Sequence, residues 1–128
     1  MNELSISDII SGNSAVKVIR TDSAFNLQFM GDFDLENPSE FFDPYFNNVH
    51  SEIIRNKQRN IDIITKELNF INSSSIKCIV KWIVNIQRLQ PHERYTLTFR
   101  TNKDILWQKL SFEALQFFAL DTVKVLPG

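Results

Sequence analysis

Residues 68–77 read Leu-Asn-Phe-Ile-Asn-Ser-Ser-Ser-Ile-Lys. They follow a β-branched run, Ile61–Thr65, and precede an apolar segment with helical periodicity, Ile76–Leu89. Three hydroxyl side chains, Ser73–Ser75, therefore lie where a strand is expected to end and a helix to begin. A small polar side chain there caps free N–H groups of the first helical turn. The same N–H groups and the helix dipole also favour an added phosphate. The stretch is therefore either a helix cap or a site of covalent switching.

The composition of the chain is that of an ordinary soluble domain. It has 128 residues, of which 43% are hydrophobic and 23% charged, enough for one domain with its own core. The formal net charge of -1 gives no indication of a nucleic-acid surface or a polybasic membrane patch. A single cysteine, Cys78, excludes an intramolecular disulfide and fits a reducing compartment. No signal-peptide pattern and no membrane-length apolar run is found, so we expect a cytoplasmic protein.

The order of the predicted elements indicates the fold class. Residues 1–14 are mixed and polar, and we expect a loosely ordered segment ahead of a single domain at 15–128. Strands are predicted at 15–19, 25–30, 61–65, 94–100 and 122–125. The first two form a hairpin, and helices alternate with the other strands. This order predicts an α/β domain with a mixed, mostly parallel sheet of about five strands and helices packed on the sheet.

Three helices are expected between the later strands. The first begins at Asn37 and Pro38, and its apolar stripe comprises Phe42, Tyr45, Phe46, Val49 and Ile53. The second spans Ser75–Gln90, before the helix-breaking Pro91. The third is capped by Thr101 and Asn102, and the apolar residues it uses are Leu106, Leu110, Ala114, Phe117 and Phe118.

The sequence offers little support for an enzyme or a cofactor site. Two histidines and one helical cysteine make nucleophilic or metallo-hydrolase chemistry improbable. Three glycines are too few for a phosphate-cradling or dinucleotide-binding loop. The acidic stretch 32–36 resembles a calcium loop only faintly, because Asn37 occupies the position that requires glycine. We therefore expect no enzymatic activity, no cofactor and no metal.

Two motifs carry a resemblance to a known family. Residues 68–74, followed by an apolar helix, resemble the phosphorylation loop of anti-sigma-factor antagonists, which have the STAS fold. Residues 36–44 and 72–78 are more similar to a subgroup, the SiaC-type regulatory phosphoproteins. The resemblance covers roughly residues 29–125. One departure is Ser75, which stands where the general STAS loop has glycine.

The resemblance implies a phosphorylation-gated regulatory binding protein. In such systems a serine/threonine switch kinase phosphorylates the loop, a PP2C-type phosphatase reverses the modification, and one form binds a downstream target. That target is an anti-sigma factor or, in the SiaC branch, a diguanylate cyclase. By resemblance the phosphorylated residue is Ser73, as in the SiaC branch, or Ser74, as in the general STAS pattern, with Ser73 slightly preferred.

We further expect Asn72, Ser75 and Phe41 to contribute to partner binding. The alternative is a constitutive STAS-like scaffold or interaction domain whose serines only cap the helix. No nucleic-acid or membrane partner is expected in either case.

Overall fold

The computed structural model describes residues 6–22 and 24–128, and within them the chain forms six strands and three α-helices. The strands are β1 (Ile9–Ser11), β2 (Ser14–Arg20), β3 (Phe25–Phe33), β4 (Asn60–Ile71), β5 (Thr96–Thr101) and β6 (Val123–Pro127). The helices are α1 (Pro38–Arg55), α2 (Ser73–Gln87) and α3 (Leu106–Phe118), with a short 3-10 helix, η1 (Pro91–Glu93).

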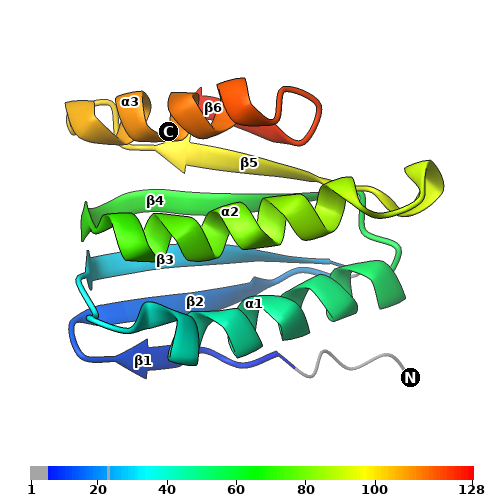
Figure 1. Cartoon of the computed structure of the whole chain (residues 1–128), viewed down its shortest axis with the longest axis horizontal. Coiled ribbons are helices and arrows are strands. Elements are labelled where there is room, and N and C mark those ends of the chain that lie inside the picture. Colours follow the sequence, from blue (N-terminus) through cyan, green and yellow to red (C-terminus); the bar gives the residue numbers. More distant parts are fainter. Residues whose placement is uncertain (1–5, 23) are drawn as a thin grey trace.

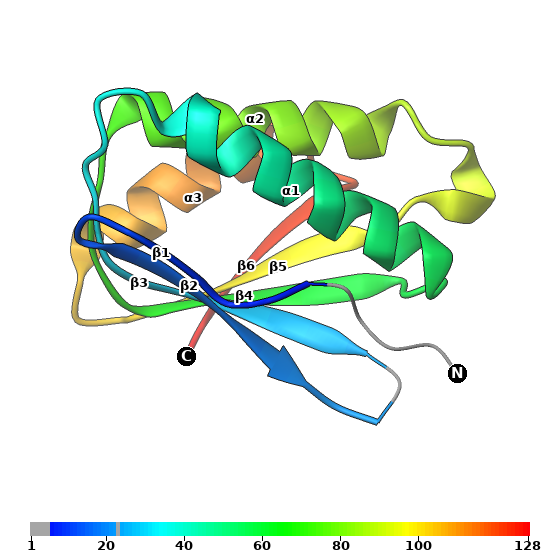
Figure 2. The same ribbon diagram turned by 90° about the horizontal axis from the view of Figure 1, so that it is seen from below.

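The strands form one sheet in chain order, β1-β2-β3-β4-β5-β6. The pairs β1–β2 and β2–β3 are antiparallel, whereas β3–β4, β4–β5 and β5–β6 are parallel. Each parallel pair is joined through a helix, and every crossover moves one strand along in the same direction. Crossovers of one hand then place all the helices on the same face, as Figure 2 shows. The predicted α/β architecture, with its N-terminal hairpin, is confirmed.

The core lies between the sheet and the helices. Alternate residues of the strands face it, for example Phe25, Leu27 and Phe29 of β3, all with no exposed area. The predicted apolar stripe of α1 is buried against them in full. Stacked rings continue this packing across the helix layer, with centroids 6.0 Å apart for Phe29–Phe46 and 4.9 Å apart for Phe46–Trp82. Aromatic packing thus fixes α1 and α2 relative to β3.

The N-terminal segment is more ordered than we expected. Residues 1–5 lie outside the described residues, but Ile6 is buried and β1 pairs with β2. The Tyr45 hydroxyl donates a hydrogen bond to the Ser7 carbonyl, and the Arg20 guanidinium donates one to the Ile6 carbonyl. The prediction of a loosely ordered segment is therefore wrong for residues 6–14, and the sheet has six strands rather than about five. A strand of three residues is too short to give a periodic signal.

The orientation predicted for the third helix is also wrong. α3 begins at Leu106, and its N-cap position is Ile105, which makes no side-chain cap, rather than Thr101 or Asn102. Its buried residues are Gln108, Phe112 and Leu115. The residues predicted to form its apolar stripe are instead exposed, with Leu106 69%, Leu110 61% and Phe117 81% accessible. The helix is apolar on two faces, so its periodicity did not identify the buried one.

A buried glutamine accounts for the face that α3 uses. β4 carries extra residues relative to β3, because Gln28 pairs with Ile64 but Met30 pairs with Glu67. The bulge turns two β4 carbonyls, those of Thr65 and Leu68, toward α3. The Gln108 side-chain amide donates to both, each at 2.7 Å. Its oxygen accepts from the Thr65 hydroxyl and from the Asn102 amide.

Replacing Gln108 with leucine is expected to lower the free energy of unfolding by about 3 kcal/mol, because two buried carbonyls lose their donor. Urea denaturation measures the effect. Gln116→Leu is the matched control on the same helix, since Gln116 is only partly buried, and it should change stability by less than about 1 kcal/mol. Equal losses in the two variants would contradict the structural role of Gln108.

Candidate functional site

The segment that joins β4 to α2 lies at the carboxyl edge of the parallel strands. β3 and β4 end there, at Phe33 and Ile71, and α1 and α2 begin there (Figure 1). In open α/β sheets this edge is where ligands and partners commonly bind, because connecting loops present side chains and free helix N–H groups together. The predicted serine stretch is therefore placed at an edge suited to recognition.

Asn72 organises this edge. Its side-chain oxygen accepts a hydrogen bond from the Ser75 amide at 2.8 Å, so Asn72 is the N-cap of α2. Its side-chain nitrogen donates to the Leu35 carbonyl at 3.0 Å, and its backbone amide donates to the Phe33 carbonyl at 2.9 Å. One residue thus connects the end of β3, the following loop and the start of α2. The cap comes from Asn72 and not from the three serines.

The three serines have different surroundings. Ser75 is buried, with 1% of its surface exposed, and its hydroxyl donates a long hydrogen bond, 3.4 Å, to the Phe33 carbonyl. It lies beneath the surface, which does not fit direct contact with a partner. Ser73 and Ser74 are exposed in the first turn of α2. These two hydroxyls are therefore accessible to a modifying enzyme.

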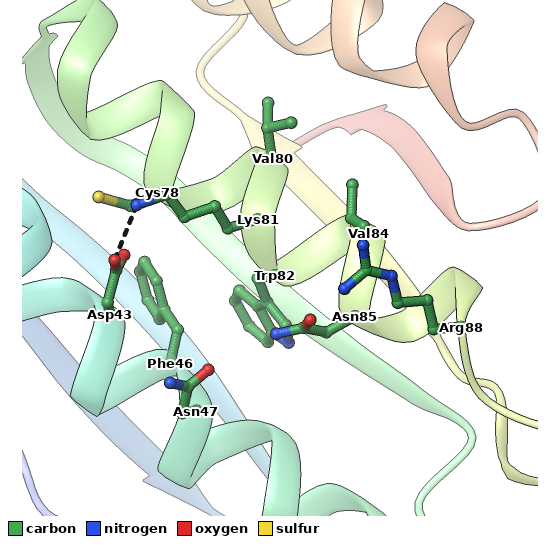
Figure 3. A pocket seen from close by; sticks show the side chains of 10 residues that line it. All are labelled: Asp43, Phe46, Asn47, Cys78, Val80, Lys81, Trp82, Val84, Asn85 and Arg88. Carbon is green, nitrogen blue, oxygen red and sulfur yellow. Dashed lines mark hydrogen bonds and ion pairs between the residues drawn. The ribbon is translucent and has the colours of Figure 1, made fainter.

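A groove runs between α1 and α2 from this edge. A shallow hollow of about 190 Å³ lies at its start, and a larger one of about 360 Å³ follows it. In the larger hollow, Phe46 and Trp82 lie between the helices, whereas Val80 and Val84 point away from α1 (Figure 3). We call the two hollows together the α1–α2 groove. Its lining residues are Glu36, Asn37, Pro38, Ser39, Asp43, Phe46, Asn47, Ser74, Lys77, Cys78, Val80, Lys81, Trp82, Val84, Asn85 and Arg88.

One stripe of α2 faces this groove. It consists of residues spaced by four or three positions, which share a side of a helix: Ser74, Cys78, Lys81, Asn85 and Arg88. Ser73 precedes Ser74 by one residue and so points about 100° away around the helix. Only Ser74 of the two exposed serines lines the groove.

The groove carries opposite charges at close range. Lys81 of α2 forms an ion pair with Asp43 of α1, with its nitrogen 2.8 Å from the carboxylate (Figure 3). This hydrogen bond raises the pKa of Lys81 above its ordinary value. Lys77 adds a second positive charge beside Ser74, and Glu36 places a negative charge in the same hollow. The entrance is therefore polar and mixed in sign, with an apolar floor behind it.

The thiol in the groove is not activated as a nucleophile. Burial and the neighbouring Asp43 carboxylate raise the pKa of Cys78 to about 11, so its thiol remains protonated near neutral pH. Its sulfur is 3.5 Å from the Ser74 carbonyl, which makes it a packing residue of α2. Among the described residues, no three histidine, cysteine or acidic side chains are grouped as metal ligands.

The structure separates Phe41 from the groove. Phe41 is half-buried and packs edge-on against Phe42, with ring centroids 5.2 Å apart. It precedes Asp43 by two residues, which places it on roughly the opposite side of α1. Asp43, Lys77 and Lys81 are among the groove residues that were not predicted as site residues from the sequence. The spacing of Ser74, Lys77 and Lys81 along one helix could have been recognised in the sequence. The ion-pair partner of Lys81 could not, because Asp43 lies 38 positions away along the chain.

The floor of the groove is held by a buried tyrosine. The indole nitrogen of Trp82 donates to the Tyr95 hydroxyl at 2.6 Å. That hydroxyl lies 2.7 Å from Nδ1 of His50 and donates its own proton there when His50 is neutral. Burial lowers the pKa of His50, although Glu93 acts in the opposite direction. The three side chains connect α1, α2 and the residue that precedes β5 beneath the groove.

The arrangement of sheet and helices defines a fold of the STAS type, as found in SpoIIAA-like proteins. No protein-family model matches the sequence, and no curated protein matches it. Among solved structures, the chain is similar to SiaC in the complex of the diguanylate cyclase SiaD with its activator SiaC from Pseudomonas aeruginosa. That match has a TM-score of 0.69 at 16% identity and covers 94% of this chain and 98% of the other.

Two further structures share the fold. An anti-sigma factor antagonist from Mycobacterium paratuberculosis aligns with a TM-score of 0.56 at 10% identity, over 90% of this chain and 86% of the other. A protein with a SpoIIAA-like fold from Shewanella loihica aligns with a TM-score of 0.54 at 14% identity, over 92% and 90% of the two chains. SiaC is named as the activator of SiaD, and the Mycobacterium protein is named as an antagonist of an anti-sigma factor. In the described part of this chain, no helix is sufficiently long and apolar to span a membrane.

The burial of His50 predicts a pH dependence of stability. The folded protein holds His50 with a lowered pKa, so below about pH 6.5 the unfolded chain binds more protons than the folded one. The free energy of unfolding should therefore fall as the pH decreases through this region. His50→Gln should flatten the profile measured by urea denaturation, whereas His92→Gln, at an exposed position, should leave its slope unchanged. Parallel profiles for wild type and His50→Gln would contradict the account.

Proposed function

We propose that this protein is a phosphorylation-gated binding module and that Ser74 accepts the phosphate. The observation that supports this most strongly is the position of Ser74. Its hydroxyl is exposed in the first turn of α2, on the same stripe as Lys81 and beside Lys77, at the entrance of the α1–α2 groove. Asn72 already caps the helix, so these serines are not needed as its caps. That leaves the alternative, a constitutive scaffold with capping serines, with less support.

A phosphate on Ser74 would act through charge. It would bring about −1.5 to −2 charges to the N-terminus of α2, where the helix dipole favours them. Lys77 and Lys81 are the cations that line the same hollow. Lys81 would then be shared between the phosphate and Asp43, its present partner at 2.8 Å. The charge pattern at the groove entrance would change while the core beneath stays packed.

Other residues have supporting roles in this proposal. Asn72 and Ser75 hold the turn in place through their hydrogen bonds to the end of β3. Ser73 is the second candidate acceptor, since it is exposed beside Ser74. A contribution of Phe41 to partner binding stays a prediction, and its position indicates a contact outside the groove.

The partners follow from the proposed switch. A serine/threonine switch kinase would add the phosphate and a PP2C-type phosphatase would remove it. The downstream target we propose is a diguanylate cyclase, because the SiaC structure was solved with one and aligns with nearly the whole of this chain. An anti-sigma factor is the second candidate, on the likeness to the antagonist structure. The protein would act in the cytoplasm as a non-enzymatic regulator without a cofactor.

Binding measurements on defined phosphoforms test the proposal. Full-length protein carrying phosphoserine at position 74, introduced during translation, is compared with unmodified protein for binding to the diguanylate cyclase of the same host by calorimetry. We expect the Kd to differ by at least tenfold. Phosphoserine at position 73 should have a smaller effect, because that side chain points away from the groove. Lys81→Gln should reduce the effect of phosphorylation, whereas Lys17→Gln, on another part of the surface, should not.

Equal affinity of the two forms would contradict gating at Ser74 and would favour the scaffold alternative. If phosphoserine at position 73 has the larger effect, Ser73 is the acceptor and the groove argument is wrong. If neither form binds the cyclase, the same series is repeated with the anti-sigma factor of the host. A failure there as well would overturn the proposed class of target.

A further inference from the structure

α3 is apolar on two opposite faces. One face packs on the sheet, where Phe112 stacks on Phe99 with ring centroids 4.6 Å apart. The opposite face is exposed, and the loop residue Leu120 beyond it is 70% accessible. We define the α3 outer face as Leu106, Leu110, Ala114, Phe117 and Phe118. A helix that is apolar on two opposite faces is normally covered on both, so this exposure indicates a missing contact.

The exposed area is of the size used in protein interfaces. Leu106, Leu110, Phe117, Phe118 and Leu120 are between 52% and 81% accessible. Together they leave on the order of 600 Å² open to solvent, at the upper limit of what a monomer usually exposes in one patch. A stable interface buries about 800 Å² on each partner. These apolar side chains therefore supply most of one partner's share of such an interface, and the polar flank of α3 lies beside them to extend it.

We propose that the α3 outer face binds a second copy of this chain, with the two α3 helices antiparallel about a two-fold axis that passes outside the helix, level with residues 111 and 112. In that register Leu106 of each copy faces Phe117 of the other, and Leu110 faces Ala114 of the other. In this register Leu110 packs on the small Ala114, and the large Leu106 and Phe117 meet toward the ends of the helix pair. Self-complementarity of this kind is what a two-fold interface requires.

The charges beside the face are complementary in the same register. Lys109 and Glu113 lie on one flank of the α3 outer face. No ion pair among the described residues includes either of them. In the antiparallel pair, Lys109 of each copy lies near Glu113 of the other, which gives two equivalent ion pairs. On the other flank, Trp107 of each copy faces Phe118 of the other. A different protein would have to present large, small and charged side chains at the matching positions. A second copy of α3 presents them by symmetry.

Sedimentation equilibrium of this 128-residue chain at micromolar concentration tests the proposal. We expect a mass of twice 14.9 kDa for the wild type and of 14.9 kDa for Phe117→Asp. Ile10→Asp is the matched control, because Ile10 is 77% exposed but lies on β1, and this variant should remain dimeric. Urea denaturation of each variant, diluted until all are monomeric, shows whether the fold is intact.

A charge exchange tests the register itself. Lys109→Glu should weaken the dimer at least tenfold, because it replaces both of the equivalent ion pairs with two acidic groups opposite each other. Lys109→Glu combined with Glu113→Lys should restore the wild-type Kd. A monomeric wild type would overturn the proposal, and so would a dimer that Phe117→Asp leaves intact. If a monomeric wild type instead loses affinity for the cyclase on Phe117→Asp, the face binds that partner and not a second copy.

Discussion

The hydrogen bonds of Asn72 are the constraint on which the rest of the site depends. Asn72 bonds to the Phe33 carbonyl, the Leu35 carbonyl and the Ser75 amide, each at 3.0 Å or less. These bonds fix where β4 ends and α2 begins relative to β3. Since the cap is supplied by Asn72, Ser75 turns inward and Ser73 and Ser74 remain at the surface. Because Asn72 caps α2, the hydroxyls of Ser73 and Ser74 are not needed as helix caps.

The groove and the α3 outer face occupy different parts of the molecule. The groove lies between α1 and α2, whereas α3 covers β5 and β6 at the far edge of the sheet (Figure 1). Two chains paired through α3 would therefore keep both grooves open. A target with two equivalent binding segments would gain affinity from such a pair through a raised effective concentration, without any additional contact in either groove. Dimeric regulators are the kind of target that benefits most.

The elements that the sequence predicted well are those with a single clear periodicity. β3 alternates cleanly, and all five predicted stripe residues of α1 are buried. The elements that it predicted only in part lack such a pattern. β4 changes phase at its bulge, with Ile61, Ile63 and Thr65 buried first and Leu68 and Ile71 after it. α3 is apolar on both faces, and the buried one is selected by Gln108, whose four hydrogen bonds no sequence pattern reveals. The groove depends on contacts between α1 and α2, such as Asp43 with Lys81, that form only in the folded chain.

The most direct test of the central claim is phosphosite mapping of this protein isolated from its own host under several growth conditions. Peptide mass spectrometry would be run beside a phosphatase-treated control. The account predicts partial phosphate on Ser74 that changes between conditions and disappears after treatment. Ser74 without phosphate in every condition would contradict the account, and the exposed serines would then be ordinary surface residues of a constitutive binding domain.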